Sequence, residues 1–218
     1  MNDMTIFICI KTFHLKTSKI NIVKIINYSI YKEKKMTDFK LTQNFKLSEF
    51  TNTDLTPYQT ALVQLLANNL QKVRDYLQQF KVDPKKNVSV GISSGVRTQS
   101  DYDKLIKKGY NPSKTSDHFC GLQLACKPCI GAADVYVKNC SLKLKDIAAK
   151  IIELDKAGQV DFGQVIYEYN PATRAEWIHL GNDWEKVFSD QGIIDSMNKT
   201  RKKYLMSLDN GKTYRDFK

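Results

Sequence analysis

Apolar residues recur at helical spacing between residues 57 and 80. The positions that share one face are Leu62, Leu66, Leu70, Val73, Leu77 and Phe80. Just upstream, Thr56 can cap a helix, Pro57 suits the first helical position and Gln59 completes a capping box. The pattern predicts a long helix with its apolar face in the core. Folded structure is expected to begin near "FKLSEF", residues 45–50.

A second helical pattern lies in "LKLKDIAAKIIEL". Its apolar residues on one side are Leu144, Ile147, Ile151 and Leu154. "SSGVRT" follows an apolar run and reads as a Ser-Gly turn that presents Arg97. The tail "YLMSLDNGKTY" predicts a hairpin, because Asn210-Gly211 favours a type I′ turn.

Short β-rich runs predict four further strands, over residues 88–92, 132–137, 164–169 and 175–180. The turn "NPAT" joins the last two runs. Strands in succession between two helices indicate an α+β fold with a mainly antiparallel sheet flanked by helices. We place this single domain at residues 36–218.

Residues 1–35 form an appended basic leader in our interpretation. They carry seven lysines against Asp3 and Glu33, and contain no Gly or Pro. "TIFICI" is too short for the core of a signal peptide, and Lys11 interrupts it. We therefore expect synthesis in the cytoplasm without a signal peptide, and Met36 offers an alternative start. The alternative is a short basic amphipathic helix that lies on a membrane surface.

Composition and charge narrow the functional classes. The 218 residues are 42% hydrophobic and 26% charged, which is ordinary for a globular protein. No run of about 18 apolar residues exists, so we expect no integral membrane segment. The net charge of +11 suits an anionic partner such as nucleic acid, anionic lipid or a bacterial wall, or serves solubility alone. A nucleic-acid partner ranks last because no binding motif is recognisable.

The histidines point to a metal site. Of three histidines, His14 lies in the leader, whereas His118 and His179 lie beside predicted strands. Two imidazoles and a carboxylate, such as Asp134, form a typical catalytic zinc set that leaves one position open. Glu176 could then serve as the base that activates water. The alternative is that both histidines are structural residues at strand ends.

Four cysteines within 21 residues offer a competing ligand set: Cys120, Cys126, Cys129 and Cys140. Structural zinc sites with four cysteines usually show two separated CxxC pairs, and only Cys126 and Cys129 form one. We favour reduced cysteines, or a disulfide between Cys126 and Cys129, over a second metal.

Four motifs, which follow one another along the chain in the family's order, resemble those of the zinc D-alanyl-D-alanine carboxypeptidases. This family includes vancomycin-resistance D,D-dipeptidases, D,D-carboxypeptidases and phage endolysin peptidases. "SDH" and "AAD" resemble the halves of SxHxxGxAxD, and "EWIH" resembles ExxH. "FKLSEF" is similar to the opening of phage-type members, and "SSGVRT" to their SGYRS segment. The resemblance spans residues 45 to about 181.

The resemblance implies a role for each matched residue. His118, Asp134 and His179 correspond to the zinc ligands, and Glu176 to the catalytic base. Arg97 corresponds to the arginine that contacts substrate and steadies the polarised carbonyl. Ser116 corresponds to a substrate-contacting serine.

Two features depart from a simple match. His118 and Asp134 are sixteen positions apart, nine more than the pattern has, and the extra residues fall in "GLQLACKPCIG", over residues 122–130. Such an insertion preserves the ligand geometry if its ends lie close together. Glu176 and His179 point to opposite faces of a regular strand, so both can reach one metal only if the strand bends, bulges or begins between them.

The functional prediction is a zinc metallopeptidase that cleaves peptidoglycan stem peptides, at a D-alanyl bond, as a D,D-carboxypeptidase or in the manner of an endolysin. We expect a monomer that acts at the cell wall. The alternative from another class is a catalytically impaired wall-binding or phage structural module with the same fold.

Overall fold

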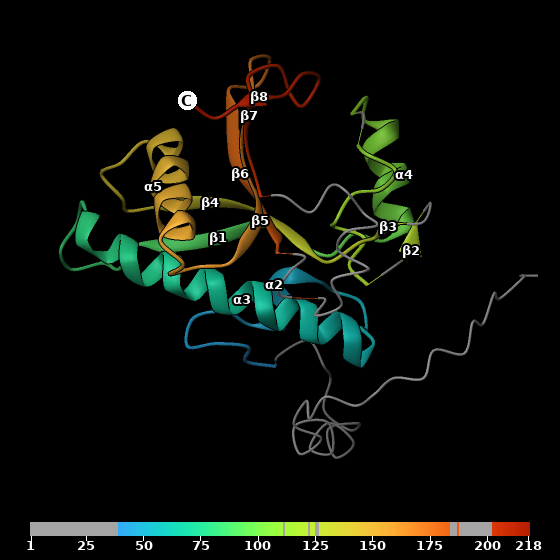
Figure 1. The fold of residues 1–218 in the computed structure, drawn as a ribbon, viewed down its shortest axis with the longest axis horizontal. Helices are drawn as coiled ribbons and strands as arrows, with labels where there is room; N and C mark the ends of the chain where they lie inside the picture. Colours follow the sequence, from blue (N-terminus) through green and yellow to red (C-terminus); the bar gives the residue numbers. More distant parts are fainter. Residues whose placement is uncertain (1–38, 111, 122, 125–126, 184–186, 188–201) are drawn as a thin grey trace, which may run out of the picture. The chain divides into compact units, whose positions relative to one another are not determined.

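One sheet of six strands organises the part of the chain that the computed structural model describes (Figure 1). The described residues are 39–110, 112–121, 123–124, 127–183, 187 and 202–218, and all belong to the unit Lys35–Lys218. The predicted leader, residues 1–35, lies entirely outside them, so its role stays a prediction.

The sheet is mixed but mostly antiparallel. In sheet order, its strands are β1 (Ser89–Ser94), β4 (Ala132–Lys138), β6 (Ala175–Asn182), β5 (Phe162–Asn170), β7 (Lys203–Ser207) and β8 (Arg215–Asp216). Among the described strands, only β5 and β7 pair in parallel. Together with the helices, this arrangement confirms the predicted α+β class.

Two helices pack against one face of this sheet. Helix α3 (Pro57–Leu77) starts at the predicted cap, where the Thr56 side chain accepts a hydrogen bond from the Gln59 N–H. A 3₁₀ turn, η3 (Gln78–Phe80), extends it. Helix α5 (Leu144–Lys156) is the second predicted helix, and no described helix is long and apolar enough to cross a membrane. The predicted apolar positions are buried, except for a half-buried Phe80.

The register of the central strands separates core side chains from site side chains. Ala133 pairs with Leu180, which also pairs with Val165, and all three belong to the core under α3 and α5. Asp134 pairs with His179 one position along. Because side chains alternate along a strand, Asp134 and His179 occupy the opposite face of the sheet.

Two short helices complete the described part. Helix α2 (Leu47–Phe50) lies in "FKLSEF" and buries Phe50. Helix α4 (Gln99–Lys107) was not predicted, although Thr98 and Asp101 form a capping box at its start. The helix is short, and none of its residues is buried.

The inserted segment folds as a hairpin of its own, with β2 (Gln123–Leu124) antiparallel to β3 (Lys127–Pro128). At its base, the Gly121 N–H donates to the Cys129 carbonyl at 2.7 Å. The two ends of the insertion are therefore adjacent, which is the condition under which the ligand geometry survives it.

The tail forms the predicted hairpin, although its connection is longer than two residues. β7 and β8 pair antiparallel, and residues 208–214 join them. Asn210 and Gly211 have φ values of 63° and 76°, the sign that a type I′ turn requires at both central positions.

Candidate metal centre

Three side chains that are distant in the sequence converge on one point. Nε2 of His118 lies 3.2 Å from Nδ1 of His179 and 3.2 Å from Oδ1 of Asp134. Nδ1 of His179 lies 2.9 Å from the same Oδ1. Ligand atoms in a tetrahedral zinc site are about 3.3 Å apart. This group could hold a metal ion.

Hydrogen bonds on the far side of each imidazole orient the ring for ligation. Nδ1 of His118 lies 2.7 Å from the carbonyl oxygen of Gly95, which can only accept, so this nitrogen carries the proton. Nε2 of His179 lies 3.2 Å from Oε1 of Gln164 and donates to it. The two remaining nitrogens therefore direct lone pairs at the same point. Such partners of the second nitrogen are usual for histidines that bind metals.

The electrostatics of the cluster favour a cation. Burial opposes the charge on Asp134, but the adjacent His118 and His179 hold the pKa of its carboxyl well below the usual range. Burial also opposes protonation of His179, yet the hydrogen bond and charge of Asp134 raise the pKa of this imidazole overall. A carboxylate held between two imidazoles thus attracts either protons or a metal ion.

The segment "SSGVRT" supports the cluster from one side. The backbone N–H of Arg97 donates to the backbone carbonyl of His118 at 2.8 Å. The backbone N–H of Val96 donates to the Phe50 carbonyl at 2.7 Å. A Cβ at Gly95 would lie 2.2 Å from that same Phe50 oxygen, so only glycine fits here. The segments "FKLSEF" and "SSGVRT" are thus in direct contact and together position the carbonyl that orients His118.

Arg97 and Ser116, both predicted as substrate contacts, lie at the cluster. Nη2 of Arg97 lies 3.9 Å from Oδ2 of Asp134 and donates to the Ser94 hydroxyl at 3.2 Å. Burial lowers the pKa of Arg97, but Asp134, Asp101 and Glu168 counteract this effect. The Ser116 hydroxyl accepts a hydrogen bond from the His118 N–H at 3.4 Å.

Glu176 is not brought to the cluster. β6 runs without a register shift through this stretch, with Glu176 opposite Tyr169 and His179 opposite Ile166. Glu176 is exposed on the side of the sheet that faces α3 and α5, where it accepts a hydrogen bond from the buried Tyr167 hydroxyl at 2.7 Å. The strand neither bends nor begins between the two residues, so the expectation that Glu176 and His179 converge is wrong.

Glu168 is a second carboxylate on the metal side of the sheet, besides Asp134. It lies in β5 opposite Trp177, two positions from the residue that pairs with His179. Burial raises the pKa of Glu168 to about 7; the charge of His179 lowers it, Asp134 raises it, and Trp177 and Arg97 lower it. Glu168 therefore interacts electrostatically with His179 and Asp134 of the cluster and with the adjacent Arg97.

Sequence reasoning missed Glu168 and Gln164, but a signal for both was present. In the observed hairpin, whose strands are joined by residues 171–174, Ile166 falls opposite His179. Gln164 and Glu168 flank Ile166 at even spacing, so they share the face of His179. Hairpin register, rather than spacing along one strand, identifies the acid beside the histidines.

The three cysteines that the structure describes are not among the ligands grouped at this centre. Cys120 and Cys129 are buried, and Cys140 is half-buried; none of the three is in a disulfide. Burial, with contributions from Asp117 and Cys129, raises the pKa of Cys120 to about 12, so its thiol stays protonated. Among the described residues, no cysteine joins a group of three potential metal ligands. Cys126 lies outside the described residues.

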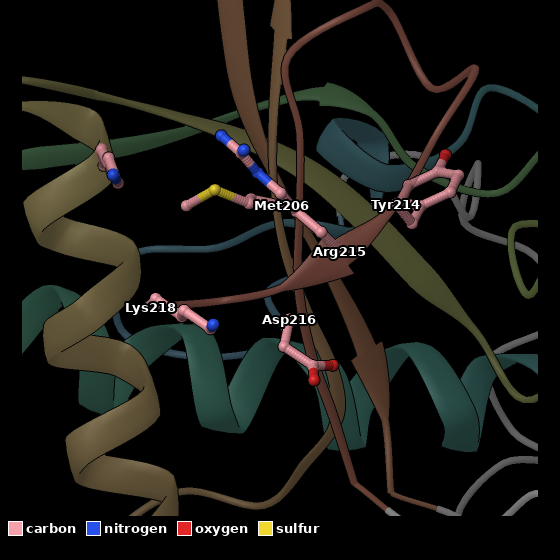
Figure 2. Close-up of a pocket in the computed structure, with 6 residues that line it drawn as sticks. Met206, Tyr214, Arg215, Asp216 and Lys218 are labelled. Atoms are coloured by element: carbon pink, nitrogen blue, oxygen red, sulfur yellow. The ribbon is translucent and has the colours of Figure 1, made fainter.

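A separate pocket of about 650 Å³ opens beside the C-terminal strand (Figure 2). Its lining residues are Lys145, Met206, Tyr214, Arg215, Asp216 and Lys218. None of the three clustered side chains lines it. The three clustered side chains therefore lie outside this pocket, which shares Tyr214 with their side of the sheet.

Comparisons with protein-family models, curated proteins and solved structures give no match to this chain.

Proposed function

We propose that the protein is a zinc-dependent peptidase that hydrolyses peptidoglycan stem peptides at a D-alanyl bond. The observation that carries the proposal is the orientation of the two imidazoles. Gly95 and Gln164 accept the outward N–H groups, so His118 and His179 present lone pairs to one point beside Asp134. Two nitrogens and one carboxylate oxygen, with a base nearby, suit the three-ligand pattern of catalytic zinc.

The side chains around this point supply the remaining chemistry. Zinc, when bound by His118, Asp134 and His179, contributes Lewis acidity, which polarises a carbonyl and lowers the pKa of water. Glu168 accepts a proton from the attacking water and delivers it to the leaving amine as the C–N bond breaks. Arg97 stabilises the negative charge that develops on the scissile carbonyl oxygen.

The choice of substrate rests on the motif resemblance, and the fold is consistent with it. "FKLSEF", "SSGVRT", "SDH", "AAD" and "EWIH" all contribute residues to, or support, one region of the sheet. The glutamate assigned as base differs from the one that the ExxH spacing suggests. The charge outside the leader, +6, suits an anionic wall as the place of action.

The test is digestion of purified peptidoglycan by the zinc-loaded protein, with mass analysis of the released fragments. We expect free D-alanine from stem peptides that end in D-Ala-D-Ala, loss of release with a chelator, and recovery when zinc is restored. Asp134→Ala should bind far less zinc and release nothing, whereas Cys120→Ala should retain both properties. A parent protein that holds stoichiometric zinc, binds the wall and releases no fragment would instead be the wall-binding module.

A further inference from the structure

The loop between β7 and β8 brings a tyrosine to the metal side of the sheet. Arg215 pairs with Met206, which is part of the core under the helices. Tyr214 precedes Arg215, and its side chain therefore belongs to the opposite face. Figure 2 shows the Tyr214 ring turned away from Met206 and from the Arg215 side chain.

Gly211 shows how near this tyrosine lies to Glu168. A Cβ built at Gly211 would be 2.9 Å from the Tyr214 hydroxyl oxygen and 3.3 Å from Oε2 of Glu168. Both oxygens therefore surround the same small volume. Glycine leaves that volume open between the tyrosine and the carboxylate that we assign as base.

The loop that carries Tyr214 is tied to the sheet and to itself. The Asn210 N–H donates to the Tyr169 carbonyl at 3.0 Å, at the end of β5 next to Glu168. The Gly211 N–H donates to the Ser207 hydroxyl at 2.9 Å, and the Asp209 carboxylate accepts the Thr213 N–H at 3.0 Å. These bonds fix the approach of Tyr214 to the site.

The phenol is chemically suited to donate. Burial raises the pKa of Tyr214 to about 12, and the charges of Glu168, Asp134 and Asp209 add to this effect. Its hydroxyl therefore remains protonated across the working pH range. The residue as a whole is 49% exposed, so it lies at the surface of the protein.

We infer that Tyr214 is a substrate-contacting residue whose hydroxyl donates a hydrogen bond to a carbonyl or carboxylate oxygen of the bound stem peptide. This inference rests on the proposed function. The tyrosine and Arg97 are the two donors that we assign to substrate oxygens at this centre.

The test is Tyr214→Phe, which removes only the oxygen and keeps the ring. We expect kcat/KM for a D-Ala-D-Ala stem peptide to fall about 3- to 10-fold, the effect of one lost neutral hydrogen bond. Binding of a phosphinate analogue of D-Ala-D-Ala, measured by calorimetry, should weaken by the same factor. Zinc content, melting temperature and the pH at half-maximal rate should not change. Tyr76→Phe, on α3 across the sheet, is the matched control and should alter none of these.

The outcomes separate the inference from the proposed function. If the parent hydrolyses the peptide and Tyr214→Phe matches it in both kcat/KM and analogue binding, the contact does not exist but the peptidase assignment stands. If the parent binds zinc but neither hydrolyses the peptide nor binds the analogue, both are overturned. A change in the pH profile of Tyr214→Phe would show that the residue acts on the titration of Glu168 and not as a donor to substrate.

Discussion

Nδ1 of His118 lies 2.7 Å from the carbonyl oxygen of Gly95, and this contact links the backbone of one motif to the tautomer of another. The carbonyl can only accept, so it forces the proton onto Nδ1 and leaves Nε2 to face Asp134 and His179. The same glycine has no room for a Cβ because the Phe50 carbonyl lies directly beside it. Backbone packing thus determines the state of an imidazole.

Gly95→Ala tests this link. A Cβ at 2.2 Å from the Phe50 oxygen must displace backbone, which moves the carbonyl away from His118. We expect zinc affinity to fall about 10- to 100-fold, the usual effect of losing the partner of a ligating histidine. Titration against a competing chelator measures it. Gly109→Ala is the control: its φ of 81° is strained but its surroundings are open, so stability should fall without a change in zinc affinity. Equal zinc affinities in the two variants would contradict the link.

Glu168→Gln and Glu176→Gln form a matched pair that assigns the base. Glutamine cannot accept the proton of the attacking water, so we expect Glu168→Gln to lower kcat by about 10²- to 10⁴-fold with zinc retained. Glu176→Gln keeps an oxygen that can accept the hydrogen bond from the Tyr167 hydroxyl, so it should keep nearly full turnover. Hydrolysis of a D-Ala-D-Ala stem peptide gives kcat for both variants. The reverse ranking would restore Glu176 as the base.

The titration of Glu168 should appear in the stability of the metal-free protein. Burial raises its pKa in the folded state to about 7, so the folded protein binds this proton more tightly than the unfolded chain. The resulting stabilisation is complete below the ordinary glutamate pKa and is lost as the pH rises through about 7. Relative to Glu168→Gln, the parent should lose on the order of 3 kcal/mol of unfolding free energy between pH 4.5 and 7.5. Urea unfolding along this pH series measures the difference, and a parallel pH dependence in the two proteins would exclude it.

Asp155 joins α5 to two strands and should be a major stabilising residue. It is 2% exposed and accepts hydrogen bonds from the Phe162 N–H at 2.8 Å, the Tyr204 hydroxyl at 2.7 Å and Nζ of Lys202 at 3.0 Å. Asp155→Ala leaves these donors without an acceptor, so we expect a loss of about 3 kcal/mol in urea unfolding. Glu153→Ala, on the same helix, removes only an exposed pair with Lys150 and should cost less than about 1 kcal/mol. Similar losses in both variants would contradict this role.

The elements that could be predicted are those with long, regular patterns. Helices α3 and α5 bury an apolar stripe, and the paired strands around "NPAT" carry continuous β-rich runs. Helix α4 is short, and its apolar residues Tyr102, Leu105 and Ile106 cover only about one turn, so the pattern was too brief to be recognised. The parallel strands β5 and β7 are separated in the sequence by β6, and no local sequence pattern encodes a contact between such distant segments.

The candidate site could be predicted only in part, for a reason of register. The motifs and their order predicted His118, Asp134 and His179 as ligands, and the sheet brings these three residues together. Glu176 was favoured because it is three residues from His179, but in a strand this spacing places the two side chains on opposite faces. Glu168 and Gln164 approach His179 across the hairpin, and pairing between strands is not visible in the spacing along one of them.

The closed base of the β2–β3 hairpin has a consequence for protein engineering. A backbone hydrogen bond joins Gly121 to Cys129. Changes to the residues between these two positions therefore need not disturb the rest of the domain. The hairpin is thus a site next to the metal centre where foreign sequence can be inserted. A peptide tag, a fluorescent label or a loop from another protein could be exchanged there while His118 and Asp134 keep their positions. Motif searches that fix the number of residues between the histidine and the aspartate would likewise overlook any protein with an insertion at this site.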